Sequence, residues 1–233
     1  MTVVSYSGFR FPRDIIQRAV WMYLRFTLSF RDVEELLAER GVIVTYESIR
    51  RWVVTFGPVI ARDLRARRPK PHSSWHLDEV FVRIGGRQMY LWRAVDAEGE
   101  VLDVLVQSKR DGRAAQKLMR KLLKKQGMAP DTWVTDKCPA YGAALRELNL
   151  NRAVHVQRKR ANNRAESSHV PVRRRERKQQ GFKSPGSAQR FLSMYAATYN
   201  TFTVPRHLVS AQTHRLFRAK AFETWRGAAG MVA

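Results

Sequence analysis

The sequence lacks the residues of several protein classes. Its single cysteine, Cys138, excludes internal disulfide bonds and any cysteine-rich zinc site. Its six histidines are scattered without the spacing of metal ligands. Apolar stretches such as residues 19–24 are far too short to span a bilayer. No basic segment followed by an apolar one opens the chain, so we expect no secretory signal. These absences predict a cytoplasmic protein without a membrane partner.

Acidic residues are also scarce. The 233 residues include 43 Lys and Arg but only 20 Asp and Glu, which gives a net charge of +23. Such a charge predicts a polyanionic partner, and nucleic acid is the one left once a membrane is discounted. Residues 151–233 hold 17 basic and three acidic residues, whereas residues 71–150 hold 13 and 10. Because acids repel phosphates, their concentration in the middle third of a nucleic-acid-binding protein suggests metal binding.

Residues 12–57 show the apolar spacing of three helices. Ser29 with Asp32 resembles a capping box, Gly41 breaks the second helix, and Thr45 caps the third. Two short helices around a glycine-containing turn predict a helix-turn-helix. Its second helix would present Tyr46, Arg50 and Arg51 to a DNA groove. The alternative is a three-helix packing module with a solvated charged face.

A different periodicity follows the basic, proline-containing segment 62–72, which reads as a linker. Residues 75–84 and 87–95 alternate as strands around a Gly85-Gly86 hairpin turn, and 101–107 form a third strand. An amphipathic helix capped by Asp111, a short strand at 132–135, a helix at 139–148 and a strand at 153–157 come next. This order predicts an α/β fold around a mixed sheet.

Three acids stand out by their positions. Asp78 lies within the first strand, Asp136 ends the fourth, and Glu166 stands in a basic segment. Two aspartates on strands and one glutamate from a helix would suffice to bind Mg²⁺, which takes few protein oxygen ligands. The alternatives are that the aspartates form turns and that Glu166 pairs with neighbouring arginines. Glu79 should point to the opposite face of the sheet from Asp78, and is a weaker candidate.

Several blocks together resemble a known family. Trp75-His76-x-Asp78-Glu79 and Gly86-Arg87-x-x-Tyr90-Leu91-x-Arg93 resemble the start of a transposase integrase core. Thr135-Asp136-Lys137-x-Pro139 resembles the block with its second acid, and Asn162-Asn163-Arg164-Ala165-Glu166 the block with its third. In this order, and after a helix-turn-helix, they resemble the insertion-sequence-six family of bacterial transposases.

The resemblance implies a domain organisation and a chemistry. The expected domains are a helix-turn-helix domain at 1–61, a linker at 62–72, a ribonuclease-H-like catalytic core at 73–200 and a helical tail at 201–233. Asp78, Asp136 and Glu166 would form the catalytic triad and hold two Mg²⁺ or Mn²⁺ ions. Arg173 matches a basic residue that the family carries after the glutamate. Family members cut and join DNA at terminal inverted repeats, typically by a replicative route.

The resemblance also implies partners. The expected partners are the double-stranded DNA of the terminal inverted repeats and of the target site. The expected location of the protein is the bacterial cytoplasm, in association with the nucleoid. We expect Arg158, Lys159, Arg160 and Arg173 to hold phosphates, and Asn162 and Asn163 to position substrate or the helix bearing Glu166. Turn formation is the alternative role for the asparagines. Two element ends suggest a homodimer or larger assembly, with candidate contacts at Phe191, Leu192, Met194, Tyr195, Leu216, Phe217 and Trp225.

Two other functions stay open at this stage. One is a related integrase or recombinase with a host role, and the other is a DNA-binding regulator that has lost catalysis. The complete set of three acids counts against the regulator. Inverted repeats beside the gene would separate a transposase from a relative with a host role.

Overall fold

The computed structural model describes residues 4–150, 152–157, 159–204 and 208–230, without the side chains of residues 159 and 160. The chain divides into two compact units. One unit draws on Met1–Arg68 and Ser193–Ala233, and the other is Pro69–Leu192. None of the helices in the described ranges is both long and apolar enough to cross a membrane.

The first unit is helical. Helices α1 (Arg13–Arg25), α2 (Phe30–Ala38) and α3 (Tyr46–Ala66) confirm the three helices predicted from the apolar spacing, and α1 and α2 both pack on α3. The capping box forms as predicted: Ser29 Oγ accepts from Asp32 N at 3.1 Å, and Ser29 N donates to Asp32 Oδ2 at 2.8 Å. The Thr45 hydroxyl caps α3 by accepting from Ser48 N at 3.4 Å.

The predicted linker at 62–72 begins too early, because α3 continues through Ala66. The reason is that Ile60, Ala61 and Leu64 continue the buried stripe of the helix, while Arg62 between them is exposed on another side. The predicted tail at 201–233 likewise joins the helical unit. Helix α8 (Ala211–Ala228) packs on α3, and Gln17 Nε2 donates to Ala229 O at 2.7 Å. The structure therefore divides the chain differently from the four consecutive segments expected from sequence.

The second unit is built on a five-stranded sheet in the order β3-β2-β1-β4-β5. Strands β1 (Ser74–Ile84), β2 (Arg87–Asp96) and β3 (Val101–Gln107) form an antiparallel meander. Strands β4 (Thr132–Thr135) and β5 (Val154–Gln157) run parallel to β1. Gly85 and Gly86 have φ of 54° and 77°, as a two-residue hairpin turn requires. The predicted mixed α/β sheet is confirmed.

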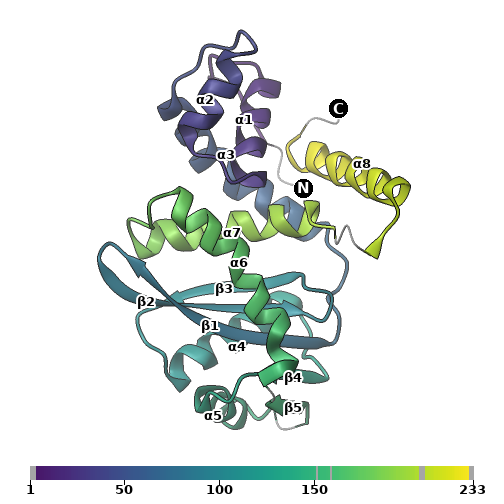
Figure 1. Ribbon diagram of the computed structural model, residues 1–233. Helices are drawn as coiled ribbons and strands as arrows, with labels where there is room; N and C mark the ends of the chain where they lie inside the picture. Colours follow the sequence, from purple (N-terminus) through teal and green to yellow (C-terminus); the bar gives the residue numbers. More distant parts are fainter. Residues whose placement is uncertain (1–3, 151, 158, 205–207, 231–233) are drawn as a thin grey trace. The chain divides into compact units, whose positions relative to one another are not determined.

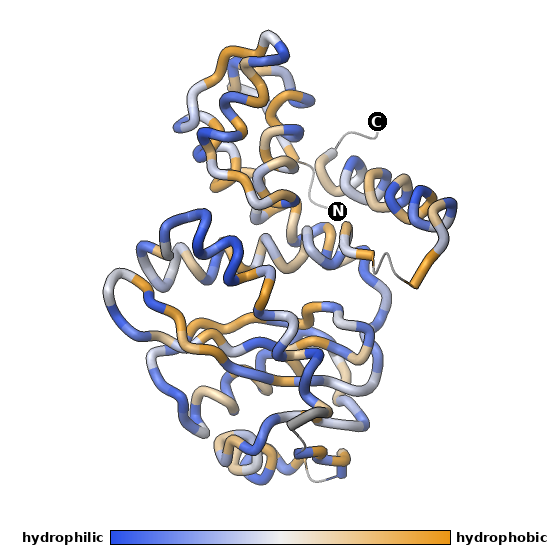
Figure 2. Tube along the Cα trace, in the orientation of Figure 1, coloured by the Kyte–Doolittle hydropathy of each residue, from blue (hydrophilic) through white to orange (hydrophobic). Residues whose placement is uncertain are grey.

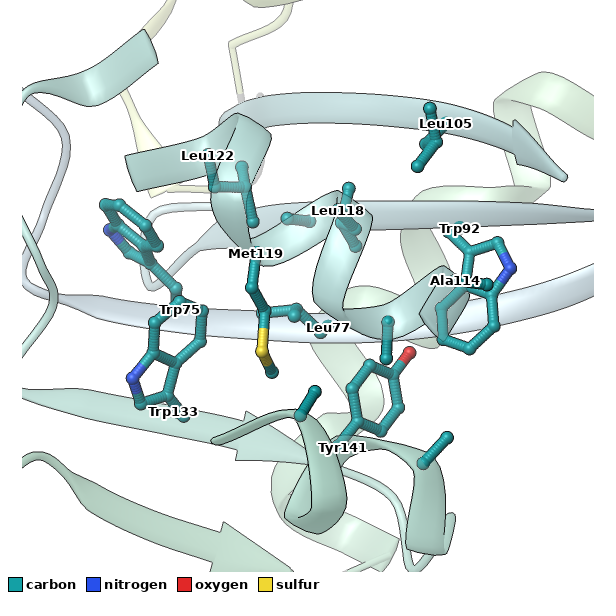
Figure 3. Close-up of a cluster of buried hydrophobic side chains, with 14 of the residues drawn as sticks. Trp75, Leu77, Trp92, Leu105, Ala114, Leu118, Met119, Leu122, Trp133 and Tyr141 are labelled. Carbon is teal, nitrogen blue, oxygen red and sulfur yellow. The ribbon is translucent and has the colours of Figure 1, made fainter. Parts of the chain in front are cut away.

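Helices cover both faces of this sheet (Figure 1). Helices α4 (Gly112–Gln126) and α5 (Pro139–Glu147) pack against one face, where Trp75, Leu77, Trp92 and Trp133 form a core with their apolar residues (Figure 3). On the other face, the short 3₁₀ helix Lys159–Asn162 leads into α6 (Asn163–Lys178), which packs on β1 and β2. Figure 2 shows the second half of α6 as hydrophilic. Helix α7 (Pro185–Phe202) follows and runs from this unit into the helical one.

Candidate active site

Asp78 lies on the face of β1 that α6 covers. Its Oδ2 is 3.1 Å from Nε2 of His169, a buried residue of α6. Directly across the β1–β2 ladder is Arg93, which is fully buried and donates from Nε to Ser168 Oγ at 2.9 Å. Opposed residues of an antiparallel pair project on the same face. The Asp78 carboxylate is therefore partly buried between a strand and a helix, on the same face of the sheet as a buried arginine.

Asp136 follows β4 at the matching position. The parallel register pairs Leu77 with Thr135, so Asp78 and Asp136 are each the next residue along neighbouring strands. The Asp136 Oδ1 accepts from Cys138 N at 2.9 Å, and its Oδ2 is 3.6 Å from Arg110 NH2. The register brings the two predicted aspartates to the same level of neighbouring strands, just past the last β1–β4 pair, with Asp78 inside β1 and Asp136 directly after β4.

Glu166 lies in the first turn of α6 and is exposed. Within the described residues it has no hydrogen bond or ion pair, which argues against its pairing with the arginines of this basic segment. The helix is anchored on both sides of Glu166. Asn162 Nδ2 donates to Leu77 O at 2.9 Å, and His169 contacts Asp78. Glu166 is thus carried by the helical turns that lie against Leu77 and Asp78.

Glu79 points to the opposite face from Asp78, as the strand alternation predicts. Its side chain is 1% exposed and accepts from Tyr141 OH and from Arg110 Nε, both at 2.5 Å. Burial raises the pKa of Glu79, while its two hydrogen bonds oppose that rise. Ligand atoms of Glu79, Asp136 and Cys138 lie within 4.8 Å of one another. Glu79 is therefore close to Asp136, a relation that strand alternation alone did not reveal.

His169 is a residue of the site that the sequence did not identify. Burial lowers the pKa of its imidazole, although the hydrogen bond to Asp78 acts in the opposite direction. Burial thus favours the neutral ring, and Nε2 is the donor because a carboxylate oxygen accepts. The only sequence signal for His169 is its place three residues after Glu166, on a neighbouring part of the helix surface.

The residues predicted to contact DNA have different surroundings. Arg50 and Arg51 are exposed on α3 and Tyr46 is half-buried. Arg50 NH2 pairs with Glu47 at 2.9 Å, and the Arg51 guanidinium lies 5.7 Å from the centre of the Phe9 ring. Arg158 lies outside the described residues, as do the side chains of Lys159 and Arg160. Asn163 is exposed.

Two of the predicted DNA-contact residues make hydrogen bonds within the chain. Asn162 is fully buried, so it cannot touch DNA in this structure, and its amide instead holds the backbone of β1. Arg173 is half-buried and donates to Phe81 O at 2.6 Å and to Glu176 Oε2 at 3.0 Å. Both residues fix α6 on the strand that bears Asp78. Neighbouring polar residues of a helix face different directions, and their sequence does not say which of them is buried.

Comparison with known proteins finds relatives over most of the chain. A family model described as a DDE domain matches residues 72–203. The transposase for insertion sequence-like element IS431mec of Staphylococcus aureus is 32% identical over 194 residues, which cover 82% of this chain and 86% of that protein. The transposase for insertion sequence element IS257 in transposon Tn4003 of the same species is 31% identical over 194 residues, with the same coverage.

Solved structures show weaker likeness. A chain of the simian T-cell lymphotropic virus intasome in complex with PP2A regulatory subunit B56 gamma has a TM-score of 0.44 and 14% identity, covering 75% of this chain and 66% of that one. The HTLV-2 integrase catalytic core domain in complex with magnesium has a TM-score of 0.35 and 15% identity, covering 55% of this chain and 99% of that one.

The family match and the two transposases decide the class of protein. The chain belongs to the DDE transposases of the insertion-sequence-six family. It is a polynucleotidyl transferase that acts in DNA transposition, and this class of enzyme works on DNA with divalent metal ions.

Proposed function

We propose that Asp78, Asp136 and Glu166 are the catalytic triad and hold two Mg²⁺ or Mn²⁺ ions in a ribonuclease-H-like core. The observation that carries the proposal is the β1–β4 register, which puts Asp78 and Asp136 at adjacent positions of neighbouring strands, while the helix bearing Glu166 is bonded to β1 at Leu77 and Asp78. The donor set fits, because hard divalent cations prefer carboxylate oxygens. Asp78 Oδ1 and the Glu166 carboxylate accept no hydrogen bond from the described part of the chain, which leaves them available.

The reaction is a displacement at phosphorus. In strand transfer a 3′-hydroxyl oxygen bonds to a phosphorus of target DNA, and the bond from that phosphorus to the neighbouring 3′ oxygen breaks. Two divalent ions held by Asp78, Asp136 and Glu166 would supply activation of the attacking oxygen and stabilisation of the leaving one. The protein orients Asp78 through His169, and Asn162 sets the position of α6 on β1. Arg164, Arg174 and Arg177 are exposed on α6 and are available to DNA phosphates.

Neutral variants test the triad. Asp78→Asn, Asp136→Asn and Glu166→Gln should each reduce strand transfer on oligonucleotide ends by about 10³-fold or more, since several kcal/mol of transition-state stabilisation is lost. Binding to the same DNA in a gel shift should persist, because removing negative charge does not weaken attraction to phosphates. Asp131→Asn, an exposed acid just before β4, is the control. Wild-type joining by any triad variant would contradict the assignment.

We further propose that α2 and α3 form a helix-turn-helix that reads the terminal inverted repeats. The exposed Arg50 and Arg51 in the first two turns of α3 support this role. Loss of a base contact should cost about 1–3 kcal/mol at one base pair, whereas loss of a phosphate contact should weaken binding to all sequences and flatten the salt dependence. Gel-shift titrations of Arg50→Ala and Arg51→Ala decide between these roles, with the exposed Arg218→Ala on α8 as control. Unchanged binding by both variants would refute recognition by α3.

The active form is proposed to be a homodimer or larger assembly on DNA, because two inverted repeats must be joined together and each chain has one triad. Five of the candidate contacts, namely Phe191, Leu192, Met194, Tyr195 and Trp225, are buried in the chain. Leu216 and Phe217 on α8 are 67% and 44% exposed, so they are the remaining candidates. Light scattering with and without duplex DNA tests assembly. Leu216→Glu should weaken it and Val154→Glu, on the exposed surface of β5, should not.

The route and location follow from the same proposal. We propose that this enzyme acts on nucleoid DNA in the bacterial cytoplasm and joins donor and target replicatively, which produces cointegrates. A plasmid assay that distinguishes cointegrates from simple insertions tests the route. Simple insertions alone would contradict it.

A further inference from the structure

We propose that His169 is a positioning residue that orients Asp78 for metal binding by donating one hydrogen bond from Nε2 to Oδ2. This inference rests on the proposed function, because it takes Asp78 to be a metal ligand. The contact joins residues 91 positions apart in the sequence, from α6 to β1. It therefore links the helix that bears Glu166 directly to the first aspartate.

The hydrogen bond has a defined direction. Nε2 is 3.1 Å from Asp78 Oδ2, while Nδ1 of the same ring is buried and has no hydrogen-bond partner among the described residues. A carboxylate oxygen accepts, so the ring nitrogen that faces Asp78 is the donor. One oxygen of Asp78 is thereby fixed, and the other accepts no hydrogen bond from the described residues. The arrangement leaves an oriented oxygen available to a cation.

The neighbouring contacts hold the ring in place. His169 is 6% exposed, and Ser168 beside it bonds both Arg93 Nε and Ala165 O. Four residues further on, Arg173 is bonded to the backbone of β1 at Phe81. Because His169 is buried and α6 is bonded to the sheet on both sides of it, the imidazole has little room to turn away from Asp78. The Asp78 side chain therefore loses little further rotational freedom when it binds a cation.

Polar groups that orient a metal ligand typically change metal affinity 10- to 100-fold when they are removed. Two amide substitutions distinguish orientation from space filling. In His169→Gln the amide nitrogen is as many bonds from Cβ as Nε2 is, so its N–H can replace the lost donor. In His169→Asn the amide nitrogen corresponds to Nδ1, which does not face Asp78. Both replacements are polar and uncharged, so only the position of the donor differs.

The experiment measures Mn²⁺ binding to the full chain on duplex DNA, from the electron paramagnetic resonance signal of free Mn²⁺. We expect His169→Asn to raise the Mn²⁺ dissociation constant about 10- to 100-fold and His169→Gln to stay within a few-fold of wild type. Leu118→Ala, a truncation in the core on the opposite face, should lower the melting temperature without changing that constant. Equal weakening by Gln and Asn, or wild-type binding by Asn, would overturn the inference.

A parallel Asp78→Asn titration separates the two proposals. If Asp78→Asn loses Mn²⁺ binding and His169→Asn does not, Asp78 is a ligand and His169 has no positioning role. If Asp78→Asn binds Mn²⁺ as the wild type does, the proposed triad itself is wrong.

Discussion

Asp78 and Glu79 are neighbours on β1 and both carry a carboxylate. Because they lie on opposite faces of the strand, they have different hydrogen-bond donors. Asp78 accepts one hydrogen bond from a neutral imidazole. Glu79 accepts from Tyr141 and from the charged Arg110, and is almost fully buried. A carboxylate whose oxygens are both occupied holds structure together, whereas one with an open oxygen can take a ligand. The number and charge of the donors thus separates a binding carboxylate from a structural one.

The face of Glu79 still matters to the site. Arg110 bonds Glu79 and also approaches Asp136, and Tyr141 belongs to α5, the helix that follows Asp136. This network ties the segment after β4 to the middle of β1. We infer that Glu79 keeps Asp136 in place, so changes on its face should alter stability more than chemistry.

The largest effect among variants outside the triad is expected on the α6 face. Asn162→Ala removes the buried amide from Leu77 O, which leaves that carbonyl without its partner and should cost about 1–3 kcal/mol of unfolding free energy. The substitution also releases the start of α6, which bears Glu166. The rate of strand transfer should therefore fall by more than the decrease in the folded fraction of the protein explains. Urea denaturation and strand transfer on the same preparations measure the two effects. Asn163→Ala, at the adjacent exposed position, is the matched control, and equal behaviour of the two variants would refute this role.

An intermediate effect is expected on the α5 face. Tyr141 is fully buried and burial raises the pKa of its hydroxyl well above the usual value, so the hydroxyl stays protonated and donates to Glu79. Tyr141→Phe should lower the unfolding free energy by about 1.5–3 kcal/mol, as for other hydrogen bonds to charged groups. Strand transfer by the folded variant should stay near wild type. A large loss of activity without a loss of stability would place Tyr141 in the chemistry and break the contrast between the faces.

The smallest effect is a dependence of stability on pH. Burial raises the pKa of Glu79 above its ordinary value of 4.5, so the folded protein holds this proton more tightly than the unfolded chain does. That contribution to stability is complete below pH 4.5 and is lost as pH rises through the folded pKa. Glu79→Gln cannot titrate, so the variant should gain stability relative to wild type between about pH 4 and pH 7. Urea denaturation of the variant and the wild type at pH 4 and at pH 7 measures this change in relative stability. The opposite trend would mean that the ion pair with Arg110 lowers the pKa of Glu79 by more than burial raises it.

Much of the fold could be predicted because it is encoded locally. Alternation gave the strands, Gly85-Gly86 gave the hairpin, and the Ser29 and Asp111 caps gave helix starts. The end of α3 could not be predicted, because arginines and prolines after residue 60 are equally typical of a linker. The return of α8 to the N-terminal helices involves residues such as Gln17 and Ala229, which are 212 positions apart and share no local signal.

The candidate site divides in the same way. Motif order identified Asp78, Asp136 and Glu166, because those residue types recur at recognisable blocks in the family. The residues that contact this site are brought there by the tertiary fold. His169 contacts Asp78, 91 positions away in the sequence, and Arg93 donates to Ser168, 75 positions away. Asn162 and Asn163 are indistinguishable in sequence, and only the packing of α6 on β1 buries one and exposes the other.

The central claim is that metal ions bind on the Asp78 side of β1. The most direct test is a crystal structure of the protein with end DNA and Mn²⁺, with the ions located by their anomalous scattering. We predict peaks in coordination contact with Asp78, Asp136 and Glu166, and none against Glu79. A peak held by Glu79, Asp136 and Cys138, with Asp78 still bound only to His169, would contradict the assignment.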